Sequence, residues 1–207
     1  IEFRKNNYMQ AIKLLYKAEE NIIQAGKAAH IKLVNFYNDY PKWESNIRLA
    51  YDLSKKGRTV LLVDKMKASI ILLKAGKDYK TYPVEFGNNW MGDKSMVGDK
   101  ATPEGVYKII SKKSGSKTKY YKALLLNYPN EEDRKRFDQQ KSSGKIAKNA
   151  GIGGMIEIHG EGGKGIHWTE GCIALANNDM DTVYRFCTTG TQVIIVGSGE
   201  SLEDYLK

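Results

Sequence analysis

The pattern of short apolar runs after residue 58 constrains the fold of this chain more than any other feature. From Thr59 onward, runs rich in Val, Ile, Leu and Tyr alternate with glycines and charged residues. Such short runs are typical of buried strands rather than of core helices. Residues 74–78, which read KAGKD, are a turn signal that predicts a hairpin. The runs expected to hold strands are TVLLVDK, ASIILLKAGK, DYKTYPVEFG, EGVYKIIS, YYKALLLNYP, GMIEIH and TQVIIVG.

Two segments within this region have helical character. They read NEEDRKRFDQQ and NNDMDTVYRFC. Asn177 or Asn178 is a candidate cap for the second helix, because Asp179 and Asp181 would then lie in its positive first turn. We therefore predict that residues 58–207 form a mostly β domain, with mixed sheets resembling a sandwich and a few helices.

The first part of the chain follows a helical pattern instead. Ile12 and Ile22 belong to a set of apolar residues that recur at helical spacing among Lys and Glu. The sequence NDYP interrupts the pattern before Pro41, and a further helix is expected to end at Gly57. Residues 1–57 are therefore predicted to be a small helical element. A scaffold role is favoured over ligand binding, and a protein partner for these helices is left open.

The charge balance indicates the kind of partner. The chain of 207 residues carries 33 Lys and Arg against 24 Asp and Glu, a net charge of +9, which favours polyanions such as nucleic acid, anionic lipid or the bacterial wall. The basic residues are dispersed, and no nucleic-acid-binding motif is recognisable, so nucleic acid is not the expected partner. No apolar run reaches a membrane span. The sequence begins at Ile1 rather than Met, so we expect an upstream segment, with a signal peptide or membrane anchor left open.

Residues 156–175, which read IEIHGEGGKGIHWTEGCIAL, concentrate the reactive side chains. Two of the three histidines and one of the two cysteines lie here among glycines. A cysteine attacks a carbonyl as its thiolate, which a nearby imidazole can generate. Gly171 leaves room for a carbonyl oxygen to reach backbone N–H donors beside Cys172. This stretch therefore predicts a Cys–His nucleophilic site.

Two other interpretations compete for the same residues. His159, His167 and Cys172 could bind zinc with Glu161 or Glu170, although the spacing fits no standard zinc motif. A purely structural loop, with a buried cysteine and hydrogen-bonded histidines, is the second alternative. The two cysteines, at positions 172 and 187, could also form one disulfide, or be one reactive and one buried thiol.

Three separated segments resemble the L,D-transpeptidase catalytic domain family, often called YkuD-type. Residues 92–109, GDKSMVGDKATPEGVYKI, resemble a family turn that leads into a core strand. Residues 127–137, NYPNEEDRKRF, are similar to a "YPN…DR" segment of one branch. IHG at residues 158–160 and WTEGCIALANNDMDTVYRFCTTGTQVIIV at residues 168–196 match the same branch. The resemblance covers roughly residues 59–197, and its three motifs occur in the family's order.

The resemblance implies a role for each matching residue. Cys172 would be the nucleophile and His159 the base, with the backbone carbonyl of Gly160 orienting the imidazole. The backbone N–H groups of Gly171 and Cys172 would form the oxyanion hole. Cys187 is interpreted as a core residue, and no bridge to Cys172 is predicted.

Further residues are implied to contact substrate, and two positions depart from the family pattern. Many members have a histidine before the glycine where this chain has Glu170, and an arginine where it has Ala174. The predicted substrate contacts are His167, Trp168, Thr169, Tyr128 and Arg134.

The activity implied is transpeptidation of peptidoglycan stem peptides through a thioester on Cys172. An L,D-carboxypeptidase or other wall hydrolase using the same residues is an alternative, as is a non-catalytic wall-binding protein. No cofactor and no metal is required by this chemistry. The expected location is the periplasm or another extracytoplasmic part of the envelope.

Overall fold

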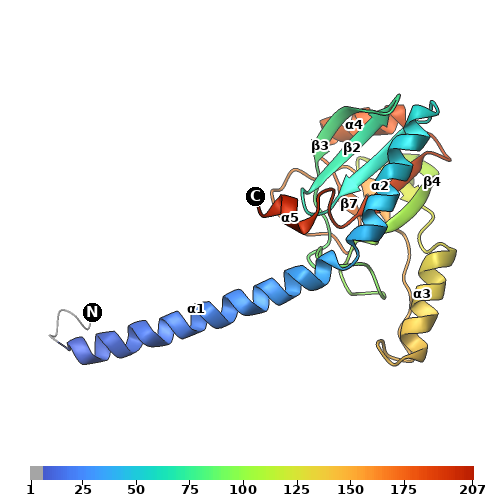
Figure 1. Ribbon diagram of the computed structural model, residues 1–207. Helices are drawn as coiled ribbons and strands as arrows, with labels where there is room; N and C mark the ends of the chain where they lie inside the picture. The colour runs from blue at the N-terminus through green and yellow to red at the C-terminus, as the bar shows by residue number, and fades with distance from the viewer. Residues whose placement is uncertain (1–6) are drawn as a thin grey trace. The chain divides into compact units, whose positions relative to one another are not determined.

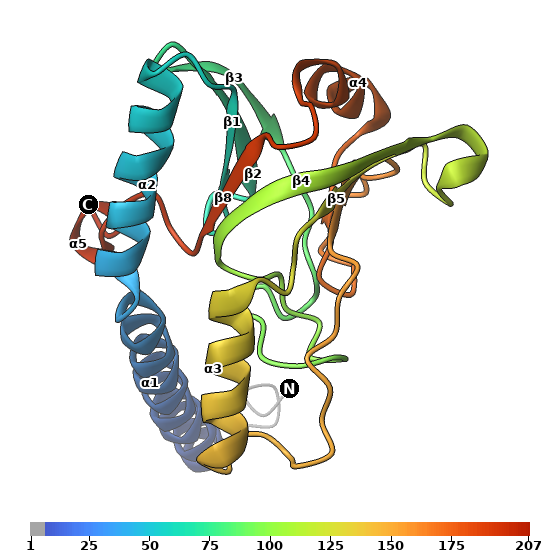
Figure 2. The same cartoon turned by 90° about the vertical axis from the view of Figure 1, so that its right-hand side faces the viewer.

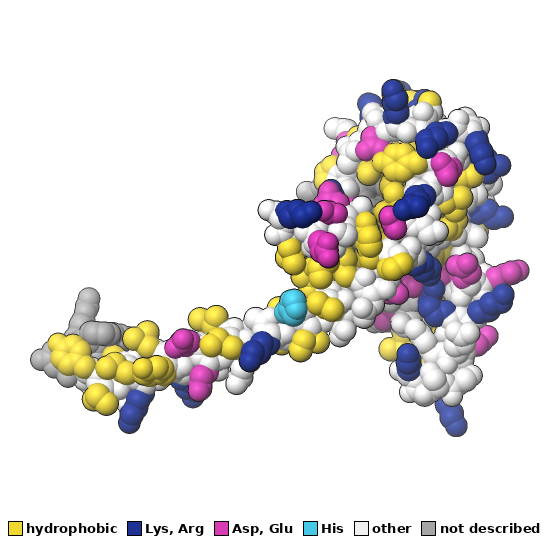
Figure 3. All heavy atoms as spheres, viewed as in Figure 1, with side chains coloured by type: hydrophobic (Ala, Val, Ile, Leu, Met, Phe, Trp, Pro, Cys, Tyr) yellow, Lys and Arg dark blue, Asp and Glu magenta, His cyan; other side chains and the backbone are white. Residues whose placement is uncertain are grey.

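The computed structural model describes residues 7–207, which divide into two compact units, residues 7–38 and 39–207. The first unit holds one helix, α1 (Tyr8–Tyr37), which begins where the side chain of Asn7 accepts a hydrogen bond from the backbone of Gln10. Apolar side chains are exposed along this helix (Figure 3). Ile22, for example, is 72% exposed.

The second unit is built on one eight-stranded sheet, shown in Figure 1. Its strands follow the order β3-β2-β1-β8-β4-β5-β6-β7. The strands are β1 (Val60–Asp64), β2 (Ser69–Lys74), β3 (Lys77–Pro83), β4 (Gly105–Ser114), β5 (Lys122–Leu126), β6 (Glu157–His159), β7 (Ile173–Ala174) and β8 (Gln192–Val196). The helices are α2 (Tyr40–Lys55), α3 (Glu131–Ser142), α4 (Asn177–Phe186) and α5 (Leu202–Tyr205), with a 3₁₀ turn η2 (Gly115–Lys117).

A bent strand, β4, joins the two halves of the sheet. Its first residues pair with β8 and its later residues pair with β5, with a register shift between Ile109 and Ser111. Figure 2 shows β4 curving from one group of strands to the other. The pairs β1–β8 and β6–β7 are parallel, and the remaining pairs are antiparallel. The second parallel pair, at the end of the sheet, carries the candidate site.

Both faces of the sheet are buried at β1 and β8, where successive apolar side chains point to opposite sides. Leu61 and Val63 belong to the main hydrophobic core, which also receives Met180 and Val183 of α4. Val60 and Leu62, on the opposite face, are buried beside α2. Figure 2 shows α2 and α4 on opposite sides of these strands.

The structure confirms several sequence predictions and corrects others. The KAGKD segment forms the β2–β3 turn, with Ala75 and Gly76 both at positive φ. The prediction of a mostly β, sandwich-like domain is only partly correct, because the strands form one sheet and helices cover more of the described chain than strands do. The predicted cap of α4 is wrong. The N-cap is Ala176, and the side chain of Asn177 instead accepts the backbone N–H of Glu161 at 2.8 Å.

The predicted domain boundary between residues 57 and 58 stays a prediction.

Within the second unit, α2 packs on the sheet, and its Trp43 is 1% exposed. A side chain at Gly197 would collide with this indole, since an added Cβ would lie 2.2 Å from it. This glycine therefore permits the close approach of α2 to the end of β8.

A buried polar network fixes the loop of residues 92–104. The ammonium of Lys65 donates to the carbonyl of Thr102 at 3.0 Å and to the carboxylate of Glu104 at 2.7 Å. Trp43 donates to the same carboxylate at 2.8 Å. Lys65 and Glu104 are almost fully buried, so each needs its partner.

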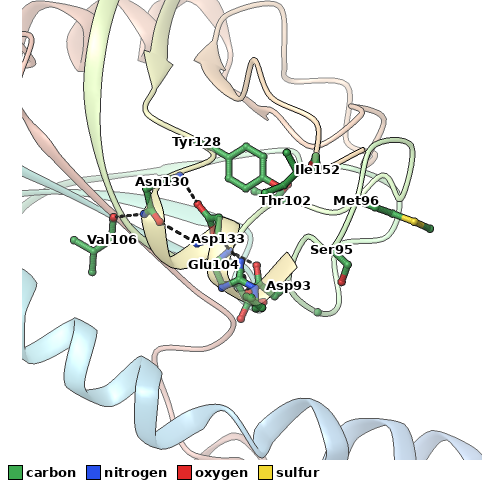
Figure 4. Close-up of polar contacts among 12 residues, drawn as sticks. Asp93, Ser95, Met96, Thr102, Glu104, Val106, Tyr128, Asn130, Asp133 and Ile152 are labelled. Atoms are coloured by element: carbon green, nitrogen blue, oxygen red, sulfur yellow. Dashed lines mark hydrogen bonds and ion pairs between the residues drawn. The ribbon is translucent and has the colours of Figure 1, made fainter. Parts of the chain in front are cut away.

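The same loop is tied to α3, as Figure 4 shows. Asp93 accepts the backbone N–H of Glu104 at 2.8 Å and pairs with Arg136 of α3 at 3.0 Å. Asn130 and Asp133 form a capping box at the start of α3. Burial raises the pKa of Asp93 to about 6. The loop thus has a fixed position beside the candidate site.

Candidate active site

Strand register places Cys172 and His159 on the same face of the sheet. His159 ends β6 opposite Ala174 of β7, and Cys172 precedes Ala174 by two residues. Residues two apart on a strand point to the same side, so both side chains leave the face opposite the core residues Ile158 and Ile173. Strand spacing and rise put their Cα atoms roughly 8 Å apart. This separation lets an imidazole and a thiol approach one another.

Several contacts hold the ring of His159. Its Nδ1 lies 2.6 Å from the carbonyl oxygen of Gly160, and because a carbonyl only accepts, Nδ1 carries the proton. Tyr120 stacks on the ring with centroids 3.6 Å apart, and Trp168 meets it edge-on at 5.9 Å. The other ring nitrogen, Nε2, is buried and makes no hydrogen bond to any described residue. Burial lowers the pKa of His159, so this nitrogen is an available base at neutral pH.

Cys172 is a neutral thiol in this arrangement. Its sulfur accepts the backbone N–H of Glu157 at 3.4 Å and donates to the carbonyl of Met155 at 3.6 Å. Burial raises the pKa of the thiol. The sequence led us to expect a thiolate held by the imidazole. Burial instead shifts the pKa of each group toward its neutral form, because both groups are desolvated.

A tight turn presents the cysteine. The hydroxyl of Thr169 donates to the carbonyl of Cys172 at 2.7 Å and accepts the N–H of Gly171 at 3.2 Å. Gly171 has φ of 126°, and a Cβ there would lie 2.6 Å from the carbonyl oxygen of Ala101. Since Thr169 occupies the N–H of Gly171, the N–H of Cys172 is the donor of this turn that remains available to an oxyanion.

The sulfur faces a cleft of about 450 Å³. Of its charged lining groups, Glu157 is paired with Lys113 at 2.7 Å, and Glu170 lies 3.6 Å from Lys100. Lys119 is exposed at the rim. The lining residues are Lys119, Tyr120, Gly154, Met155, Ile156, Glu157, Trp168, Thr169, Glu170 and Cys172.

A family model matches two thirds of this chain. Residues 58–195 match the model described as "YkuD: L,D-transpeptidase catalytic domain". The chain belongs to this L,D-transpeptidase family. The match includes both Cys172 and His159 and all of the sheet except the last residue of β8, so the family resemblance of the sequence is confirmed.

Relatives of the L,D-transpeptidase chain agree with this assignment. YafK of Escherichia coli K12, provisionally named an L,D-transpeptidase, is 26% identical over 121 residues, covering 57% of this chain and 42% of YafK. Bd1075 of Bdellovibrio bacteriovorus has the same fold, with a TM-score of 0.52, 23% identity, and coverage of 72% of this chain and 52% of Bd1075. Pgp2 of Campylobacter jejuni, a helical cell shape determining protein, also has this fold. Its TM-score is 0.53 and its sequence identity is 24%, with coverage of 70% of this chain and 49% of Pgp2. The chain thus spans about half the length of the proteins it matches, or less.

The structure places the five predicted substrate contacts at four different locations. Trp168 and Thr169 line the cleft of Cys172. His167 lines a different cavity, where its Nδ1 accepts the backbone N–H of Phe86 at 3.0 Å. Tyr128 is buried in the core with its hydroxyl on the carbonyl of Ile152, and Arg134 is exposed on α3. The cleft therefore does not include these last three residues, and their substrate roles stay predictions.

The second cysteine lies away from the cleft of Cys172. Cys187 is fully buried in the hydrophobic core, as predicted, and both cysteines are free thiols. Among residues 7–207, no three His, Cys, Asp or Glu side chains are grouped so as to hold a metal ion. Within the same range, no helix has the length and apolar character needed to cross a bilayer.

Two residues of the site were missed in the sequence. Tyr120 stacks on His159, and Glu85 binds Trp168 through a hydrogen bond of 2.7 Å. Tyr120 lies 39 residues and Glu85 lies 74 residues before His159 in the chain, and the sheet brings them together. A signal existed for Glu85, since it is a lone carboxylate inside an apolar run.

Proposed function

We propose that this domain is a cysteine acyltransferase that acts on peptidoglycan stem peptides. The observation that carries the proposal is the position of Cys172 just before β7, which pairs with β6, where the imidazole of His159 has an Nε2 without a hydrogen-bond partner among the described residues. Membership of the L,D-transpeptidase family supports the stem peptide as substrate.

The proposed reaction begins with a proton transfer from a neutral thiol. Nε2 of His159 takes the proton of Cys172 as the sulfur attacks the carbonyl carbon on the L side of an L,D peptide bond. The N–H of Cys172 then donates to the oxyanion of the tetrahedral intermediate. The C–N bond breaks, His159 returns the proton to the leaving amine of the D-amino acid, and a thioester remains.

The second half of the reaction decides between transferase and hydrolase. An amine of another stem loses a proton to His159 as it attacks the thioester, and the sulfur leaves with a crosslink formed. Water in place of the amine would give an L,D-carboxypeptidase. The net positive charge and the family's substrate support residence in the cell envelope, near anionic wall polymers.

Incubation with tetrapeptide muropeptides, followed by mass analysis, tests this proposal. Crosslinked dimers are expected from the wild type and are not expected from Cys172→Ala. Tripeptides alone would assign the hydrolase. Unchanged substrate in every sample would overturn both enzymatic versions and favour a wall-binding role.

A further inference from the structure

One carboxylate outside the cleft is bonded to both parts of the site. Glu85 is 7% exposed and forms an isolated antiparallel bridge with Ala174. Its N–H donates to the carbonyl of Ala174 at 2.9 Å, and its own carbonyl accepts the N–H of Ala174 at 2.8 Å. Ala174 in turn lies opposite His159 in the parallel pair β6–β7. Glu85, Ala174 and His159 therefore lie side by side across three chain segments.

The side chain of Glu85 holds the loop that precedes the cysteine. One carboxylate oxygen accepts the N–H of Gly165 at 2.7 Å, and the other accepts Nε1–H of Trp168 at 2.7 Å. Hydrogen bonds to a buried carboxylate are short and strong, so the bond to Glu85 restricts the orientation of the indole ring. Lys164 adds a contact on the indole, with Nζ 3.3 Å from the ring centroid.

The indole of Trp168 connects Glu85 to the base. Its edge-to-face contact with His159 has centroids 5.9 Å apart and an interplanar angle of 71°. Glu85 and His159 flank Ala174, and adjacent strands put their Cα atoms roughly 10 Å apart. The methyl side chain of Ala174 leaves the space between them for a large ring. Trp168 thus bridges the carboxylate and the imidazole.

We propose that Glu85 is a positioning residue that orients His159 through Trp168. It is not a catalytic residue, because it lines a second cavity of about 520 Å³, shared with His167, and not the cleft of Cys172. The expected effect of Glu85 on turnover rests on the proposed function. The expected effect of Glu85 on the imidazole of His159 does not depend on any substrate.

The first test is the NMR titration of the histidines in Glu85→Gln. The glutamine keeps one acceptor but opposes a second N–H donor with its own NH₂, so the indole is released and His159 becomes more solvated. Its pKa, which burial lowers, is expected to rise toward the ordinary value. Glu157, Glu161 and Lys119, the charged groups that act on His159, are unchanged in this variant.

The second histidine of the loop supplies an internal control. Burial lowers the pKa of His167 and the charge of Glu85 partly opposes this shift, so removing that charge is expected to lower the pKa of His167 further. The two histidines should therefore shift in opposite directions. A fall or no change at His159 would overturn the proposal, whatever the outcome with muropeptides.

The second test is a double-mutant cycle with Trp168→Phe, which keeps a ring and removes the N–H donor. Glu85→Gln alone is expected to lower kcat about 10- to 100-fold with little change in KM. In the Trp168→Phe background, Glu85→Gln should lower kcat by less than about 3-fold. Equal costs in both backgrounds would show that Glu85 acts only on the loop and would overturn the proposal. Glu200→Gln, which changes a carboxylate paired with Lys67 near the same cavity, is the matched control and should retain wild-type kcat.

Discussion

His159 pairs with Ala174 across β6 and β7, and Cys172 lies two residues before Ala174, yet no hydrogen bond joins Nε2 of the histidine to a described residue. The thiol is bonded to the backbone at Glu157 and Met155 instead. Burial shifts the pKa of the thiol and of the imidazole toward their neutral forms, so activation needs the transfer of the thiol proton to Nε2. This relationship leads to predictions that differ from those for a preformed thiolate–imidazolium pair.

The imidazole of His159 should be essential for turnover. His159→Ala removes the proton acceptor and should lower kcat/KM on muropeptides by about 10²- to 10⁴-fold. His30→Ala, on α1, is the matched control and should keep wild-type activity. A loss of less than ten-fold for His159→Ala would exclude this residue as the general base.

The pH–rate profile should extend into acid. His159 acts in its neutral form, and a lowered pKa keeps it neutral below its ordinary value of 6.5. Activity is therefore present above the lowered pKa and is lost as pH falls through it. The acid limb of kcat/KM should have its midpoint below pH 6.5, whereas a midpoint at or above 6.5 would contradict the buried, neutral base.

Alkylation of the free enzyme should report a neutral thiol. Burial raises the pKa of Cys172 above its ordinary value of 9.0, so labelling by iodoacetamide should still increase above pH 9. Mapping of the labelled peptides separates this thiol from Cys187, whose pKa burial raises to about 12. A labelling rate that reaches its plateau below pH 7 would show a thiolate and would revive the ion-pair interpretation.

The turn at Gly171 should not tolerate a side chain. Gly171→Ala combines a φ of 126° with a Cβ 2.6 Å from the carbonyl oxygen of Ala101, and should lower the free energy of unfolding by about 2–3 kcal/mol. Gly144→Ala, at φ of 74° with open space around it, should cost only about 1 kcal/mol. Urea unfolding of both variants measures the difference. Equal losses would mean that contact with Ala101 does not constrain the turn.

The buried ion pair under the loop of residues 92–104 should be essential for stability. Lys65→Met leaves Glu104 with the indole N–H of Trp43 but without its cation, and should cost about 3–5 kcal/mol. Lys100→Met breaks only the exposed 3.6 Å pair with Glu170 and should cost less than about 1 kcal/mol. Thermal unfolding that gives similar losses for the two variants would contradict the role of the network.

Sequence patterns predicted those turns and helices that depend on interactions between residues close together in the chain. The turn at Ala75 and Gly76, with two positive φ values, was predicted from KAGKD, and the helix predicted in NEEDRKRFDQQ is α3, which begins at a capping box on Asn130. The concentration of Cys172 and His159 in one short stretch predicted a Cys–His site, and the pairing of β6 with β7 brings the two segments together, while the catalytic roles of the two residues stay predictions.

Long-range pairing decided the rest. The parallel pairing of β1 with β8 joins segments more than 130 residues apart, and no local pattern encodes it. The same holds for Glu85 beside Ala174 and for Tyr120 on His159. The cap of α4 was mispredicted because Asn177 bonds to the loop at Glu161, a partner that only the tertiary fold supplies.

The most direct test of the account is the intact mass of the protein after rapid quenching with a stem tetrapeptide. The account predicts a thioester adduct of the tripeptide acyl group, located by peptide mapping on Cys172 and absent from Cys172→Ala, with release of one D-amino acid. A wild-type protein that forms no adduct and releases no D-amino acid would contradict the proposed chemistry.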